Sequence, residues 1–140
     1  MTKSISALLL SVAASVSAIA GPVSFDFQDP KGVNAISFHL DSLLEPISGT
    51  ANGITGTVDF NPAQPEKLSG KIVVSTPSLK VTNDTMREHL LSDGWLNAAA
   101  NPEIVFEIKD LKMAKTEGNT TTGTAVGLFS LKGVTKEISV

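Results

Sequence analysis

The chain of 140 residues has no cysteine and no tyrosine, and it has a single tryptophan and a single arginine. Without cysteine there is no disulfide, no thiolate nucleophile and no cysteine-ligated metal site. The net charge is −3 at pH 7. Nucleic-acid binding is therefore not expected, because neutralising phosphates requires clustered Lys and Arg. The same acidic balance argues against electrostatic docking on anionic membranes.

Hydrophobic residues make up 41% of the sequence and charged residues 18%, which is typical of a globular domain. The length suits one domain with a core of its own. The 11 glycines and 7 prolines, together with many Thr and Ser residues, favour short strands and frequent turns over helices.

Residues 1–20 have the three parts of a secretory signal peptide. Lys3 provides the positive start, residues 7–14 are apolar, and Ala18-Ile19-Ala20 is a small-x-small cleavage site. A transmembrane anchor is the alternative, but serines interrupt the apolar run, which is shorter than the roughly 20 residues that a membrane span needs. We predict a periplasmic or secreted protein whose mature domain covers residues 21–140.

Most of the mature chain alternates between apolar and polar residues, as half-buried strands do. The predicted strands cover residues 23–28, 34–40, 56–60, 68–76, 103–113, 120–131 and 135–140, with residues 79–81 continuing the path of 68–76, and the glycine-rich stretch 46–56 is predicted to be a bent or bulged strand. Without long helices between the strands, the fold is predicted to be all-β and antiparallel. The alternation fits a barrel or a sandwich, and the glycines in the long strands favour a barrel.

The last predicted strand reaches residue 140 without a terminating signal. Seven or eight strand segments are present, whereas a closed antiparallel barrel of this size uses about eight. An unpaired sheet edge is a liability that proteins avoid. We therefore expect a barrel that is incomplete at the C-terminus of this chain.

Residues 82–106 contain the one helical pattern of the mature chain. Thr85 and Glu88 match a capping box with Thr85 as N-cap, although Asn83 or Thr82 could cap instead. Met86 and Leu90, four residues apart, are expected to face the core. We predict one short helix that closes or lines the mouth of a barrel.

Three motifs, in this order, resemble one family. They are Gly-Thr-Val-Asp-Phe-Asn-Pro at 56–62 with Pro-Glu-Lys at 65–67; Arg-Glu-His-Leu at 87–90 with Ser-Asp at 92–93, Trp-Leu-Asn at 95–97 and Asn-Pro-Glu-Ile-Val-Phe at 101–106; and Gly-Leu at 127–128 with Leu-Lys-Gly-Val-Thr-Lys at 131–136. Together they resemble the YceI-like family of polyisoprenoid-binding proteins, over residues 23–140. The resemblance implies a lipocalin-like antiparallel β-barrel with an apolar lumen that holds an isoprenoid lipid, of the quinone or prenyl phosphate type, without a cofactor.

The candidate ligand-binding residues are the apolar residues of the predicted inner faces and the rare side chains of the helical region. They are Phe25, Phe27, Ile36, Phe38, Met86, Arg87, His89, Leu90, Trp95, Ile104 and Phe106. Arg87 and His89 are expected either to contact a lipid head group or to act in the scaffold, with Arg87 paired to Asp84 or a neighbouring acid and His89 bonded to the backbone. The apolar residues could equally form a solid core, because small barrels are filled in some proteins and hollow in others.

No catalytic or metal-binding role is predicted. His39 and His89 have no patterned acidic or cysteine partner of the kind that a zinc site needs. No strained nucleophile turn such as G-x-S-x-G is present. The main alternative to a lipid carrier is a ligand-free structural or interaction domain of the cell envelope. The sequence leaves open whether the protein forms a homodimer.

Overall fold

The computed structural model describes residues 21–41 and 46–140, so the predicted signal peptide lies outside it. In chain order, the elements of the described part are β1 (Val23–Asp26), β2 (Ile36–Leu40), β3 (Ile47–Ala51), β4 (Ile54–Phe60), the 3₁₀ turn η1 (Pro65–Lys67), β5 (Ser69–Ser75), the 3₁₀ turn η2 (Thr76–Ser78), β6 (Leu79–Lys80), α1 (Asp84–Leu91), β7 (Glu103–Glu117), β8 (Thr120–Leu131) and β9 (Val134–Ser139). The predicted strands with one short helix are confirmed.

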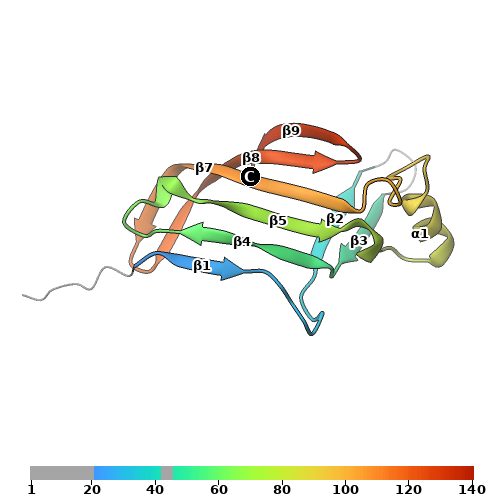
Figure 1. The fold of residues 1–140 in the computed structure, drawn as a ribbon, viewed down its shortest axis with the longest axis horizontal. Coiled ribbons are helices and arrows are strands. Elements are labelled where there is room, and N and C mark those ends of the chain that lie inside the picture. The colour runs from blue at the N-terminus through green and yellow to red at the C-terminus, as the bar shows by residue number, and fades with distance from the viewer. Residues whose placement is uncertain (1–20, 42–45) are drawn as a thin grey trace, which may run out of the picture.

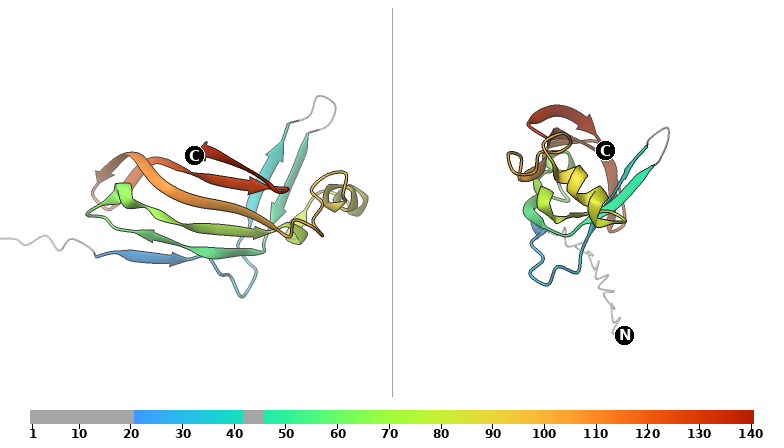
Figure 2. Two further views of the ribbon diagram at one scale, coloured as in Figure 1. Left: turned by 45° about the horizontal axis from the view of Figure 1, so that its top comes forward. Right: turned by 90° about the vertical axis from the view of Figure 1, so that its right-hand side faces the viewer.

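The strands form two antiparallel sheets (Figure 1). The larger has six strands in the order β1-β4-β5-β7-β8-β9, and the smaller has three in the order β2-β3-β6. Seen end-on, the larger sheet follows a curved wall, with α1 at one end (Figure 2). Because β1 and β9 lie at its two edges, the barrel is not closed. The all-β, antiparallel and barrel-like prediction is therefore confirmed, including the incomplete closure.

A sharp corner connects the two sheets. The chain leaves β3 in the smaller sheet, turns at Asn52 and Gly53, and enters β4 in the larger one. The Gly53 N–H donates to Ser78 Oγ at 3.0 Å, and the Ser75 N–H donates to the Gly53 carbonyl at 2.8 Å. The bend predicted within residues 46–56 lies at this corner, where it splits one strand path between two sheets.

The larger sheet has one apolar and one polar face. Across the strands, Gly56, Ile72, Phe106 and Phe129 lie opposite one another in turn and mark what we call the inner face. The adjacent outer row contains Thr57, Lys71, Glu107 and Leu128. Lys109 pairs with Glu107 on this face and lowers the pKa of the Glu107 carboxyl. Because the side-chain period of a strand is two, this register puts the apolar residues on one side.

Buried apolar residues follow the larger sheet, among them Val58, Ile108, Leu111 and Val126, and one cluster lies at the end next to α1. Ala51, Val74, Leu79 and Leu90 form a buried cluster, with Phe38, Val81, Leu91, Leu96 and Ile104 packed against it. Thr76, only 1% exposed, lies beside this cluster in η2. Its hydroxyl donates to the Asn101 carbonyl at 2.8 Å, and its N–H donates to the Pro102 carbonyl at 2.9 Å. These bonds fix the segment before β7 against the end of β5.

Two local predictions are wrong. The N-cap of α1 is Asn83, whose Oδ1 accepts from the Met86 N–H at 2.8 Å, and Thr85 lies inside the helix. The alternative cap at Asn83 is thus the correct one, because its side chain reaches the free N–H groups of the first turn. The strand predicted at 103–113 is longer than expected, since β7 continues to Glu117. A register shift between Lys112 and Lys115 absorbs the extra length, with Met113 at φ 52°.

Candidate functional site

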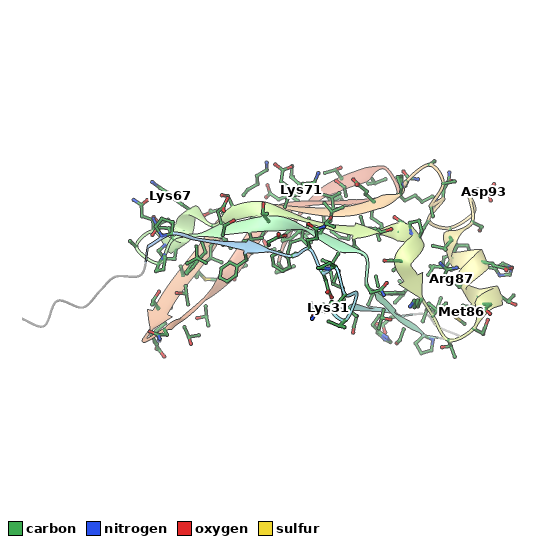
Figure 3. All side chains as sticks on the ribbon, turned by 60° about the horizontal axis from the view of Figure 1, so that its bottom comes forward. Lys31, Lys67, Lys71, Met86, Arg87 and Asp93 are labelled. Atoms are coloured by element: carbon green, nitrogen blue, oxygen red, sulfur yellow. The ribbon has the colours of Figure 1, made fainter. Side chains whose placement is uncertain are left out.

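A cavity of about 290 Å³ lies between α1 and the smaller sheet. It is lined by Ile47, Asn83, Thr85, Met86, His89, Leu90 and Trp95. Met86 and Leu90 face it together because residues four apart share one side of a helix. Figure 3 shows Met86 and Arg87 on α1, at the opposite end of the molecule from Lys67. We call this cavity the mouth cavity.

The smaller sheet contributes an apolar face to the same end. Ile36, Phe38 and Leu40 alternate along β2, and their partners on β3 are Ala51, Gly49 and Ile47. Phe38 packs against the cluster that contains Leu90, and Ile47 lines the mouth cavity. Ile36 and Leu40 are 37% and 47% exposed. An apolar strip therefore runs from the buried core to the open side of β2.

Phe38 lies directly over Gly49 on the neighbouring strand. A Cβ atom at Gly49 would be 2.3 Å from both the Phe38 ring and the Lys80 carbonyl oxygen. No real Cβ tolerates such contacts, so only glycine allows the aromatic ring to settle on β3. This pair fixes the position of Phe38 beside the core.

The inner face of the larger sheet supplies the remaining predicted apolar residues. Ile104 pairs with Val74 and packs against the core cluster next to α1. Phe106, partly buried, pairs with Ile72 on one side and Phe129 on the other. Phe25 lies opposite Val58 on the edge strand β1 and is 50% exposed, and Phe27 is 38% exposed. The inner face is thus closed near α1 and open along β1.

Arg87 is part of the scaffold. Its Nε–H donates to the Leu79 carbonyl at 2.9 Å, and its Nη2 donates to the Pro77 carbonyl at 2.6 Å. The expected pairing with Asp84 is wrong, because the guanidinium bonds backbone carbonyls of η2 and β6. Arg87 therefore ties α1 to the strand segment before it. His89, by contrast, is exposed and lines the mouth cavity.

The structure adds four cavity or strip residues that sequence reasoning did not select: Leu40, Ile47, Asn83 and Thr85. Leu40 carries a sequence signal, since it continues the alternation of Ile36 and Phe38. Ile47 has none, because it stands in a glycine-rich stretch without clear alternation. Of the predicted set, the structure brings Met86, His89, Leu90 and Trp95 into one cavity and connects Phe38 and Ile104 to it through the core. Phe25, Phe27 and Phe106 lie farther along the larger sheet.

The mouth cavity can bind a ligand mainly through apolar contacts, with a few hydrogen-bonding side chains beside them. Asn83, Thr85 and His89 are the hydrogen-bonding side chains of the mouth cavity. Within residues 21–41 and 46–140, no three His, Asp or Glu side chains lie close enough together to hold a metal ion. In the same ranges, no helix has the length and apolarity required to cross a bilayer.

Known proteins support this reading of the fold. A protein of Azotobacter vinelandii named UPF0312 is 28% identical over 114 residues, which cover 80% of this chain and 57% of that protein. BcnA of Burkholderia cenocepacia superimposes with a TM-score of 0.61 at 16% identity, over 74% of this chain and 62% of that one. The YCEI protein of Campylobacter jejuni superimposes with a TM-score of 0.56 at 21% identity, over 81% and 64%.

These similarities cover only part of each related protein. The chain spans less than two thirds of the length of each of these three proteins. The two structures share the fold at low sequence identity. Residues 28–140 match the YceI-like domain, which is most of the chain. The protein therefore belongs to the YceI-like family.

Proposed function

We propose that the protein binds a long-chain isoprenoid lipid, in the periplasm or after secretion, and that its role requires no chemistry on the lipid. One observation carries this proposal: the protein has an apolar surface made of the mouth-cavity lining and the inner face of the larger sheet, which meet at the core cluster through Leu90 and Ile104. Large apolar side chains along that surface, Trp95, Phe25 and Phe27 among them, are between 38% and 50% exposed. Exposed apolar patches of this kind mark binding surfaces.

The energy of such binding comes from the tail. Each CH₂ group removed from water contributes about 0.8 kcal/mol. An isoprenoid tail of several units therefore binds well to an apolar surface without any charged contact. The six-stranded sheet offers a surface much longer than the mouth cavity alone, which suits an extended chain.

The head group is best matched by a neutral, oxygen-bearing ring of the quinone type. A prenyl phosphate would need a cation, and the Arg87 guanidinium already bonds two backbone carbonyls. Asn83, Thr85 and His89 offer hydrogen bonds to carbonyl or hydroxyl oxygens instead. We therefore expect quinones to bind more tightly than prenyl phosphates of equal tail length.

Organic extraction of the natively purified full-length protein, followed by mass spectrometry, tests the proposal. We expect an isoprenoid lipid in stoichiometric amount. Replacing Met86, which lines the mouth cavity, by Ser is expected to lower the recovered lipid. Replacing Met113, which is 81% exposed and outside that surface, by Ser serves as the matched control and is expected to leave it unchanged.

Repeated recovery of protein without lipid would overturn the proposal. That result would favour a ligand-free structural or interaction domain of the cell envelope. If the Met86→Ser variant retained as much lipid as the Met113→Ser variant, the lipid would bind somewhere other than the mouth cavity.

A further inference from the structure

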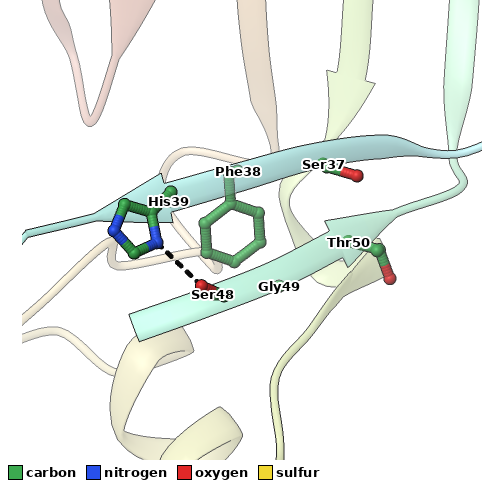
Figure 4. Close-up of a pocket in the computed structure, with 6 residues that line it drawn as sticks. All are labelled: Ser37, Phe38, His39, Ser48, Gly49 and Thr50. Carbon is green, nitrogen blue, oxygen red and sulfur yellow. Dashed lines mark hydrogen bonds between the residues drawn. The ribbon is translucent and has the colours of Figure 1, made fainter. Parts of the chain in front are cut away.

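The solvent side of the β2–β3 hairpin carries a polar cluster that lipid binding does not use. His39 lies opposite Ser48, and Ser37 lies opposite Thr50, in the antiparallel register of the two strands. Phe38, between Ser37 and His39, packs against the core, so these four residues occupy the other face. With the strand positions of Phe38 and Gly49 between them, they border a shallow surface site that is open to solvent (Figure 4).

Two hydrogen bonds connect three of the side chains of this hairpin in a row. His39 Nε2 lies 2.9 Å from Asp41 Oδ1, and His39 Nδ1 lies 2.7 Å from Ser48 Oγ. An ionised carboxylate can only accept, so Nε2 carries the hydrogen and donates it to Asp41. In the neutral imidazole, Nδ1 is then the acceptor, and the Ser48 hydroxyl donates to it. The three side chains thus form a row in which the Ser48 hydroxyl bonds the His39 imidazole and the imidazole bonds the Asp41 carboxylate.

We propose that Ser48 is a nucleophile that accepts acyl groups from small activated esters, with His39 as its general base. In the first step Ser48 Oγ forms a bond to the ester carbonyl carbon, and its proton moves to His39 Nδ1. The bond from that carbon to the leaving oxygen then breaks, and His39 returns the proton to the departing alcohol. A water molecule then gives a proton to His39 Nδ1 and forms a bond to the acyl carbon, the bond from that carbon to Ser48 Oγ breaks, and His39 returns the proton to Oγ, which releases the carboxylic acid and restores Ser48. Asp41 acts through His39 as a positioning residue.

The side chains of this cluster are open to solvent, so a substrate can reach them directly. The side chains of His39 and Asp41 are 55% and 97% exposed, and Ser48 is exposed as well. A small ester therefore reaches Ser48 from solution without passing the mouth cavity. The hydroxyls of Ser37 and Thr50 border the same surface site and can donate hydrogen bonds to the oxygens of an ester seated there.

The chain contains its own control for this proposal. Ser130 also faces a side chain on the neighbouring strand, with its Oγ 2.7 Å from Thr135 Oγ1. Both serines thus stand in cross-strand polar pairs, but only Ser48 is bonded to an imidazole. Because Ser48 is exposed and Ser130 is half-buried, their difference in reactivity is compared with the effect of His39→Gln, which isolates the contribution of the imidazole.

The test uses the folded full chain, a fluorophosphonate probe and peptide mass spectrometry. The probe forms a phosphorus–oxygen bond to a reactive serine and releases fluoride. We expect labelling of Ser48 and not of Ser130 in the unmodified protein. His39→Gln should slow the labelling of Ser48 by about 100-fold, because general base catalysis contributes factors of that size. Asp41→Asn should slow it as well, and Asp41→Glu should restore it.

Circular dichroism of each variant checks that the strands are retained, and the comparison of Ser48 with Ser130 in the unmodified protein needs no variant at all. Labelling of Ser48 no faster than that of Ser130 would overturn the proposal. Labelling of Ser48 that does not depend on His39 would overturn it too. The lipid-binding function is separate, since its extraction test uses neither residue.

Discussion

The end of the molecule next to α1 and the tip of the β7–β8 ribbon, residues 112–124, differ in how they are held together. At the α1 end, four buried side chains from three strands and the helix form one cluster, and Arg87 and Thr76 bond backbone carbonyls across elements. At the ribbon tip, the polar side-chain contacts are a Thr116–Thr121 hydroxyl pair, a long hydrogen bond from the Thr122 hydroxyl to the Lys115 carbonyl, and an ion pair between Lys115 and Glu117. Both partners of that ion pair are 73% exposed.

This difference shows where a binding surface can be built. Exposed ion pairs contribute about 0–1 kcal/mol, so side chains add little to the backbone pairing that holds the ribbon tip. A buried apolar cluster fixes the α1 end much more firmly. Leu90 belongs both to this cluster and to the lining of the mouth cavity, so the cavity is supported by the buried core. Precise sites require such support.

The largest effect is expected from Leu90→Ala. Leu90 is 7% exposed and belongs to the core cluster, so its truncation leaves a cavity and costs about 2–5 kcal/mol in the free energy of unfolding. Met113→Ala at the ribbon tip removes a side chain that is 81% exposed, and its effect should stay within about 0.5 kcal/mol. Urea unfolding measures both. Similar losses for the two variants would contradict the contrast between the regions.

The second largest effect is expected from Gly49→Ala. The new Cβ would collide with the Phe38 ring and the Lys80 carbonyl, each 2.3 Å away, which costs about 1–3 kcal/mol. Gly118→Asn at the ribbon tip is the control. Gly118 has φ +59° and open space around it, and asparagine tolerates this conformation. If urea unfolding shows Gly49→Ala to be neutral, Phe38 is not fixed by the contact described.

A smaller effect is expected at the start of α1. Asn83→Ala removes the cap of the Met86 N–H and should cost about 1 kcal/mol. Thr85→Ala should cost less, because Thr85 lies inside the helix, where alanine has the higher helix propensity. Thermal unfolding of the two variants compares them directly. A larger loss for Thr85→Ala would restore Thr85 as the N-cap.

The smallest effect concerns pH and the loop between β1 and β2. The Asn34 N–H donates to Asp29 Oδ2 at 2.6 Å, and it lowers the pKa of Asp29 below its ordinary value of 3.8, with smaller help from the N–H groups of residues 31–33. A lowered pKa in the folded state means that the charged Asp29 stabilises the fold above that ordinary value. The contribution is lost as the pH falls through the lowered pKa.

A carboxyl-detected NMR titration checks this expectation, and Asp29→Asn should remove the corresponding step in the pH dependence of stability. An Asp29 carboxyl that titrates at 3.8 or above in the folded protein would show that the Asn34 contact does not persist in solution.

Features that depend on neighbouring residues in the sequence were predictable. The strands follow from alternation, and the helix follows from the spacing of Met86 and Leu90. The choice between Asn83 and Thr85 as N-cap could not be predicted, because both residues have suitable side chains near the same turn. The difference lies in which oxygen reaches the Met86 N–H.

Features that depend on strand order and register could not be read from the sequence. Phe25 is half-exposed because β1 is an edge strand, which alternation does not reveal. Arg87 bonds carbonyls of Pro77 and Leu79, which no charge pattern predicts. His39 and Ser48 become neighbours only through the register of β2 and β3.

The central claim is that the apolar surface around the mouth cavity binds a long isoprenoid tail. Trp95 tests it most directly, because it is the one tryptophan of the chain, it lines that cavity and it is 48% exposed. We predict that a polyprenyl quinone, titrated into delipidated protein, shifts and quenches the Trp95 fluorescence to saturation, and that the same quinone ring without its tail does not. A Trp95 spectrum unchanged by the tailed quinone, or equally changed by the bare ring, would contradict the account.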